Sequence, residues 1–204
     1  MAAGRKSAAE CVLENYCIAP RSLYAVGIFD TGVTVYSQQI RALNLVWALI
    51  ESGRVPAAAA EVAAEPNLKI AIVGGGFAGL TVAAGLLKKR AVAKITIFEE
   101  PDTLLPLQQG SDSRWLHPWI YDWPGEGSQA SVAMLPVLNW TAARASDVVV
   151  QILSEWTTIV DRHTPAPDLY CNSRHLQIDE VAGDRKCLQI EWVGVTLPRC
   201  CPHL

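Results

Sequence analysis

The segment KIAIVGGGFAGLTVAAGLLKKR, residues 69–90, decides how this sequence folds. Eighteen uncharged residues separate Lys69 from Lys88, which is close to the length that crosses a bilayer as a helix. The spacing of Gly75 and Gly79 also matches the one at which transmembrane helices pack together. The same segment is equally typical of a strand, a G-x-G-x-x-G turn and a helix that together bind a nucleotide.

The sequence that follows favours the nucleotide-binding interpretation. An apolar strand run at residues 69–73 ends at Gly74, and a second strand run at residues 94–98 ends at Glu99. A membrane helix does not require a strand and a carboxylate downstream, whereas a dinucleotide-binding fold does. Between the two runs, apolar residues recur at helical spacing: Leu80, Ala83, Ala84 and Leu87. We therefore predict a dinucleotide-binding loop and no membrane span.

Each glycine of the motif has its own physical role. Gly74 allows the tight turn out of the strand, a side chain at Gly76 would block the pyrophosphate, and Gly79 lets the helix lie close to the sheet. Backbone N–H groups at the start of the helix point at the phosphates, assisted by the helix dipole. The predicted cofactor-binding residues of this loop are Gly74, Gly75, Gly76, Phe77, Ala78 and Gly79.

Glu99 is the predicted ribose-binding residue. It lies at the end of the neighbouring strand, where a carboxylate accepts hydrogen bonds from both ribose hydroxyls of the adenosine half. A carboxylate there disfavours a 2′-phosphate, so NADP is not expected. FAD and NAD share the ADP half, and both stay open at this point.

Composition excludes several classes of function. The chain has 204 residues, half of them hydrophobic, and a formal net charge of −3. That charge gives no reason to expect nucleic acid or an anionic membrane as a partner. No apolar signal segment is found at the N-terminus, and the six cysteines match no zinc-site spacing. We expect reduced thiols, no metal and a cytoplasmic location.

The N-terminal third is predicted to be a separate small unit. We expect residues 1–21 to be loosely ordered, residues 22–30 to form a strand, and residues 30–32 to form a turn. A helix is predicted from Ser37, with Gly53 as its stop. The alanine-rich stretch between Pro56 and Pro66 is predicted to be a linker or a solvent-facing helix.

Beyond the second strand, the pattern continues as one helix and three strands. Residues 141–163 carry apolar groups at helical spacing, with Thr141 as a candidate N-cap. Strand-like runs follow at residues 168–172, 175–181 and 186–193, and the last two are joined by a hairpin-type turn. The sequence therefore predicts an α/β fold with parallel strands and an antiparallel meander.

The segments IAIVGGGFAGLTVAAGLL, ITIFEE, LYCN and HLQIDEVAGDRKCLQIEWV, in this order, resemble the flavoprotein oxidoreductases and monooxygenases with an FAD/NAD(P)-binding Rossmann-type domain. The resemblance covers about residues 67–195. It implies that Gly74, Gly76 and Gly79 hold the FAD pyrophosphate and that Glu99 holds the adenosine ribose. It also divides the chain into an N-terminal extension at residues 1–66 and a Rossmann-like dinucleotide-binding domain at residues 67–204.

The chain departs from that family in its last part. The family has a further parallel strand ending in a small-Thr-Gly turn, and later a Gly-Asp that contacts the ribityl chain; this sequence has neither. We therefore expect a domain incomplete at its C-terminus, completed by another polypeptide or forming oligomers. The predicted function is an FAD-dependent oxidoreductase, or its dinucleotide-binding portion, acting on an unidentified small molecule. The alternative is a non-catalytic NAD- or FAD-binding module or an inactive truncated fragment.

An aromatic segment at residues 104–127 has two interpretations. As a lid, it would place Arg114 near phosphate or adenine and its aromatic rings against the flavin, with His117, Tyr121 or Asp122 as proton-transfer candidates. As an aromatic mini-core, it would only fix a long loop, with His117 and Asp122 hydrogen-bonded. The second interpretation is favoured, because the sequence fixes no mutual geometry. The catalytic residues are therefore unassigned.

Overall fold

A three-stranded parallel sheet lies at the centre of the protein. The computed structural model describes residues 6–18, 22–27, 33–57, 68–181 and 187–194. The sheet has the order β1-β2-β5. Its strands are β1 (Lys69–Val73), β2 (Lys94–Phe98) and β5 (Asp168–Tyr170). The predicted strands at 69–73 and 94–98 are confirmed residue for residue, and within the described part β1 is an edge strand.

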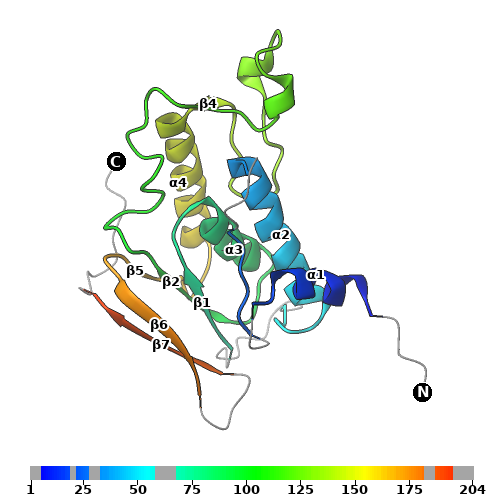
Figure 1. Cartoon of the computed structure of the whole chain (residues 1–204), viewed down its shortest axis with the longest axis vertical. Coiled ribbons are helices and arrows are strands. Elements are labelled where there is room, and N and C mark those ends of the chain that lie inside the picture. Colours follow the sequence, from blue (N-terminus) through cyan, green and yellow to red (C-terminus); the bar gives the residue numbers. More distant parts are fainter. Residues whose placement is uncertain (1–5, 19–21, 28–32, 58–67, 182–186, 195–204) are drawn as a thin grey trace.

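Helices cover one face of the sheet (Figure 1). Helix α3 (Phe77–Lys88) connects β1 to β2, and α4 (Ala145–Asp161) precedes β5. Alternate strand residues share a single core with these helices, as the period of a strand requires. The core-facing strand residues are Ile70, Ile72, Ile95, Ile97 and Leu169.

A β-hairpin packs against the other face. It consists of β6 (Arg174–Glu180) and β7 (Leu188–Val193), paired antiparallel. The ring of Trp192 contacts the rings of Phe98 and Tyr170, with centroid distances of 4.7 and 5.4 Å. The predicted antiparallel pair is therefore present as a two-stranded sheet, and its connecting residues 182–186 lie outside the described residues.

A first correction concerns the N-terminus. Residues expected to be loosely ordered form helix α1 (Ala8–Tyr16), which begins at a capping box between Ser7 and Glu10. Helix α1 buries Ala9, Leu13 and Tyr16. The prediction failed because only these three positions carry its apolar face. A helix of nine residues is only marginally stable in isolation, so contact with the rest of the protein stabilises α1.

The second correction concerns the strand predicted at residues 22–30. Its described part, residues 22–27, contains only an isolated bridge between Tyr24 and Cys17. The turn predicted at residues 30–32 lies outside the described residues, as does the alanine-rich stretch at 58–66.

Helix α2 (Val35–Glu51) confirms the predicted helix and starts two residues earlier. Thr34 and Ser37 form its capping box, and Gly53 follows its end with a φ of +70°. The helix packs along α3 (Figure 1), where Gly85 allows a close approach. A Cβ atom on Gly85 would lie 3.3 Å from Val46 Cγ2.

A buried polar side chain joins α2 to the rest of the core. Gln39 is fully buried, and its Nε2 donates to the carbonyl of Leu138 (3.0 Å) and to Thr81 Oγ1 (3.3 Å). Its Oε1 accepts from the indole of Trp140 at 2.7 Å. Three elements far apart in sequence therefore share one satisfied network, so α2 is an integral part of this core.

Helix α4 starts at Ala145, not at the predicted Thr141. The N–H of Thr141 donates to Gln151 Oε1, and Thr141 forms a bridge with Val132. The cap prediction was therefore wrong, because this threonine is held in an extended segment before the helix. That segment continues into β4 (Ala143–Arg144), which pairs with β3 (Trp115–Leu116).

The described helices also answer the membrane question. Among them, none combines the length and the apolar character that a bilayer crossing requires. Helix α3 has 12 residues, and its apolar residues are buried against the sheet and the neighbouring helices. The hydrophobicity of residues 69–90 is therefore that of an edge strand with one core-facing side, followed by a buried helix.

Candidate functional site

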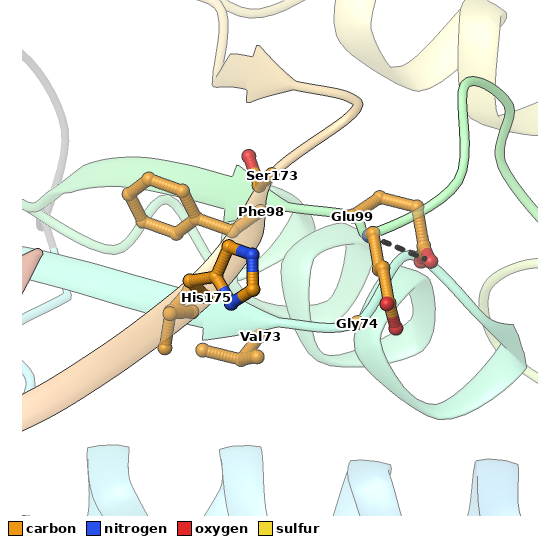
Figure 2. A pocket seen from close by; sticks show the side chains of 8 residues that line it. Val73, Gly74, Phe98, Glu99, Ser173 and His175 are labelled. Atoms are coloured by element: carbon orange, nitrogen blue, oxygen red, sulfur yellow. Dashed lines mark hydrogen bonds between the residues drawn. The ribbon is translucent and has the colours of Figure 1, made fainter. Parts of the chain in front are cut away.

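A pocket of about 320 Å³ opens where β1 and β2 end (Figure 2). Val73 and Gly74 line it from the end of β1, and Phe98 and Glu99 line it from the end of β2. In parallel sheets, ligands bind outside the carboxyl ends of the strands. Of the predicted site residues, Gly74 and Glu99 line this pocket directly.

The glycine loop turns sharply at the pocket edge. Gly74 has a φ of +101°, a conformation that L side chains rarely adopt. Its N–H donates to the carbonyl of Phe98 at 2.8 Å, which extends the β1–β2 ladder by one bond. The first glycine therefore makes the turn that the sequence analysis assigned to it.

Gly79 allows α3 to lie against the turn. A Cβ atom there would lie 1.9 Å from the carbonyl oxygen of Gly74 and 3.2 Å from Ile72 Cγ2. Real Cβ atoms do not come so close to backbone, so a residue with a side chain requires the helix to move. Gly79 therefore has the helix-to-strand packing role of the third glycine in such loops.

Gly76 lies in a different environment. A Cβ atom at this position meets no atom within 4 Å, and its backbone is extended, with φ −79° and ψ −174°. Neither packing nor backbone strain requires glycine here. The open space in front of Gly76 is where the sequence analysis places the pyrophosphate.

The second glycine is enclosed. A Cβ atom on Gly75 would lie 2.4 Å from Leu104 Cδ2 and 2.9 Å from Glu99 Oε2. The N–H of Leu105 donates to the carbonyl of Gly75 at 3.1 Å. The segment after β2 therefore folds back onto the glycine loop and fixes it, a contact between residues far apart that periodicity does not reveal.

Glu99 connects the end of β2 to the glycine loop. Its side chain is 7% exposed, and its carboxylate accepts hydrogen bonds from the N–H of Gly75 and from its own neighbour Glu100. The hydrogen bond from the N–H of Glu100 to Glu99 Oε1 is 3.1 Å long and is drawn as a dashed line in Figure 2. Burial raises the pKa of Glu99, and the Gly75 and Glu100 N–H groups oppose that rise.

Helix α3 directs its N-terminus at the same region. Its N-cap is Gly76, and no side chain of the described protein caps it. The Phe77 side chain is buried in the core, so only its N–H can face a ligand. Uncapped first-turn N–H groups, together with the positive end of the helix dipole, form an anion-binding surface.

Strand alternation continued past Phe98 would turn Glu100 away from the site, but Glu100 does not point away. Glu100 lines the same pocket as Glu99. Alternation holds only inside a strand, and β2 ends at Phe98. Glu99 and Glu100 therefore both line the pocket.

The pocket has a third wall that sequence reasoning missed. Ser173, from the connection between β5 and β6, lines it together with His175 and Leu176 from the start of β6. The N–H of Ser173 donates to the carbonyl of Glu99 at 2.9 Å, which links this connection to β2. No sequence pattern marked this wall, because the left-handed backbone of Asn172 and His175 is not visible in a sequence.

Arg114 and the aromatic segment do not line this pocket. Arg114 is exposed and precedes β3, with its carbonyl accepting from the N–H of Ala145 at 2.8 Å. Residues 115–130 form a protruding lobe away from the ends of β1 and β2 (Figure 1). The lid role for Arg114 therefore stays a prediction.

Contacts within the lobe agree with part of the mini-core interpretation, although Trp115, Trp119 and Trp123 are each more than a third exposed. His117 Nδ1 accepts from the N–H of Trp119 at 3.0 Å, so its Nε2 carries the proton and donates to Ser128 O at 2.9 Å. Trp115 and Trp123 stack with centroids 5.6 Å apart. Tyr121 is 99% exposed and so has no contact that would position it for proton transfer.

The described residues contain no cluster of three or more His, Cys, Asp or Glu side chains able to hold a metal ion. Residues 200–203, Cys-Cys-Pro-His, lie outside the described residues. No disulfide joins two of the described cysteines, which lie at positions 11, 17, 171 and 187.

Comparison with known proteins gives one partial likeness. The chain is 39% identical over 61 residues to the mitochondrial L-2-hydroxyglutarate dehydrogenase of Dictyostelium discoideum. Those residues are 30% of this chain and span 14% of the length of that relative. No protein-family profile matches the chain. No solved structure matches it either.

Proposed function

We propose that this chain binds the ADP half of a dinucleotide in a Rossmann-like β1–α3–β2 unit. The observation that carries the proposal is the contrast between Gly76 and Gly79. A side chain at Gly79 collides with Gly74, whereas the space in front of Gly76 is open, at an uncapped helix N-terminus. Packing alone explains Gly79, whereas the open space at Gly76 supports the proposal because it leaves room for a pyrophosphate.

The pyrophosphate would lie against the N–H groups of Gly76, Phe77 and Ala78. Those groups are aligned by α3, so they are fixed before the ligand arrives. Charge-assisted hydrogen bonds from N–H to phosphate are about twice as strong as neutral ones. The chain would thus bind the phosphates through backbone N–H groups alone, because the loop at residues 74–79 contains no lysine or arginine.

The ribose would bind at Glu99. A carboxylate has about four acceptor sites, and the N–H groups of Gly75 and Glu100 occupy only part of them. The remaining sites can accept from ribose hydroxyls. Because Glu99 and Glu100 both line the pocket, a 2′-phosphate there would face two carboxylates, so FAD or NAD is favoured over NADP.

We assign the chain to the oxidoreductases, with FAD as the proposed cofactor and NAD as the second candidate. The partial likeness to a dehydrogenase supports a redox role. The resemblance of the glycine segment to flavoproteins supports FAD. When bound, FAD would supply the redox chemistry, and the described residues would bind and orient its ADP half.

The test is equilibrium binding by the whole chain, measured by isothermal titration with ADP, FAD, NAD and NADP in parallel. We expect binding of ADP and FAD, no stronger binding of NADP than of NAD, and flavin absorbance in the purified protein. Binding of ADP without FAD would leave a non-catalytic nucleotide-binding module. Failure to bind ADP would contradict the proposal as a whole.

A further inference from the structure

The first strand of the hairpin carries an irregularity beside the pocket. Arg174 pairs with Val193, but Gln177 pairs with Glu191, so β6 has one residue more than β7 between these pairs. In a regular strand, His175 and Leu176 would point to opposite faces. Both line the pocket instead, and redirecting side chains beside a site is a known effect of β-bulges.

The backbone at this bulge is unusual and firmly held. His175 has a φ of +53° and Asn172 a φ of +55°, in the left-handed region that few residues other than glycine occupy. The segment is fixed from the side of β2, because Asn172 N–H donates to Pro101 O and Ser173 N–H donates to Glu99 O, both at 2.9 Å. Such backbone conformations cluster at ligand sites, where surrounding contacts maintain them.

The imidazole of His175 is exposed. Its side chain makes no hydrogen bond, ion pair or ring contact with any other residue that the structure describes. Its ring lies beside the ends of β1 and β2, near Val73 and Phe98 (Figure 2). Val73 is 55% exposed, although it lines a pocket. An aromatic ring and an exposed apolar side chain therefore line the same pocket.

We propose that His175 stacks on the base of the bound nucleotide and that Val73 and Leu176 form the apolar part of the base site. This inference rests on the proposed function, because the ribose at Glu99 places its base within the same pocket. Aromatic side chains bind bases through their π faces, without requiring a hydrogen-bond pattern. His175 would thus determine how much the base adds to affinity, while the glycine loop holds the phosphates.

The experiment compares two ligands, ADP and inorganic pyrophosphate, by isothermal titration. His175→Asn is the informative variant, because asparagine tolerates a left-handed backbone and has no aromatic ring. We expect His175→Asn to weaken ADP binding roughly 5- to 10-fold, the low end of the range for losing an aromatic stack. Its affinity for pyrophosphate should equal that of the natural chain.

Two controls accompany the measurement. Gln177→Ala changes the same strand at a residue that does not line the pocket, and it should leave both affinities unchanged. His175→Tyr restores an aromatic ring, and it should recover ADP affinity to within about twofold. In the natural chain, NMR should show contacts between the imidazole C–H protons and adenine protons of bound ADP, absent in His175→Asn.

Each remaining outcome overturns the inference. Equal ADP affinity in the natural chain and His175→Asn would reject base stacking and leave nucleotide binding intact. An equal loss for ADP and pyrophosphate would place His175 at the phosphates instead. If the natural chain bound neither ligand, the inference would fail together with the proposed function.

Discussion

The carboxylate of Glu99 accepts a hydrogen bond from the N–H of Gly75, 24 residues earlier in the chain. This bond connects the end of β2 to the glycine loop, so the proposed ribose and phosphate sites are parts of one structure. The carbonyl of Glu99 also accepts from Ser173, which attaches the third wall of the pocket. Changes at Glu99 should therefore affect both stability and binding.

Replacing Gly76 with valine should remove dinucleotide binding and leave the fold intact. A Cβ atom at this position meets no protein atom within 4 Å and the backbone is already extended, so the free protein should accept the change at a small cost in helix capping. The valine side chain would fill the volume assigned to the pyrophosphate. Isothermal titration with ADP, FAD and NAD measures the loss, and thermal unfolding checks the fold. Unchanged affinity would reject the assignment of the pyrophosphate site to the glycine loop.

The opposite result is expected for Gly79→Ala. Its methyl group would lie 1.9 Å from Gly74 O, and backbone cannot yield as a side chain can. We expect a loss of about 1–3 kcal/mol in the free energy of unfolding, as for overpacked cores. Urea denaturation of both glycine variants provides the comparison. A variant as stable as the natural chain would mean that α3 lies farther from β1.

Glu99→Ala should weaken ADP binding by about 1–3 kcal/mol, because charge-assisted hydrogen bonds to the ribose are lost. It should also lower stability, since the buried N–H of Gly75 loses its acceptor. Glu100→Ala is the matched control. Glu100 lines the pocket but accepts no bond from the loop, so its replacement should leave stability unchanged and lower affinity less. Titration and urea denaturation separate the two effects, and equal losses at both positions would contradict this assignment.

The pH dependence of stability should change in Glu99→Gln. Burial raises the pKa of Glu99 above its ordinary value of 4.5, so the folded chain holds this proton more tightly than the unfolded chain. Its contribution to stability is therefore fully present below pH 4.5 and is lost as the pH rises through the raised pKa.

Glutamine does not titrate, so the stability of Glu99→Gln relative to the natural chain should increase from below pH 4.5 towards neutral pH. Urea denaturation of both proteins over that interval measures the difference. A difference that stays constant with pH would mean that Glu99 is not buried in solution.

Gln39→Leu tests whether the N-terminal helices belong to the same core. The change leaves the Trp140 indole N–H and the Leu138 carbonyl without their partner. Each buried group left without a hydrogen bond should lower the free energy of unfolding by about 1–3 kcal/mol. Asn44→Ala, at an exposed position of α2, should stay within about 0.5 kcal/mol of the natural chain. Thermal and urea unfolding measure both. Equal stability of the two variants would support an N-terminal unit independent of the sheet.

Local sequence determined the β1–α3–β2 unit, including both strand boundaries. Its apolar runs are short and end at residues with one clear role, Gly74 and Glu99. Strand period and glycine chemistry act within a few residues, so they are visible in a sequence. The same reasoning found α2 and the hairpin strands, with boundaries displaced by about two residues.

Tertiary structure alone decided what surrounds the glycine loop. Leu104 closes over Gly75, Glu100 turns into the pocket where β2 has ended, and a bulge brings His175 beside Val73. Each of these depends on contacts between segments far apart in the chain, which no local pattern encodes. Helix α1 forms for the same reason, because burial against α2 stabilises a segment whose own propensity is insufficient.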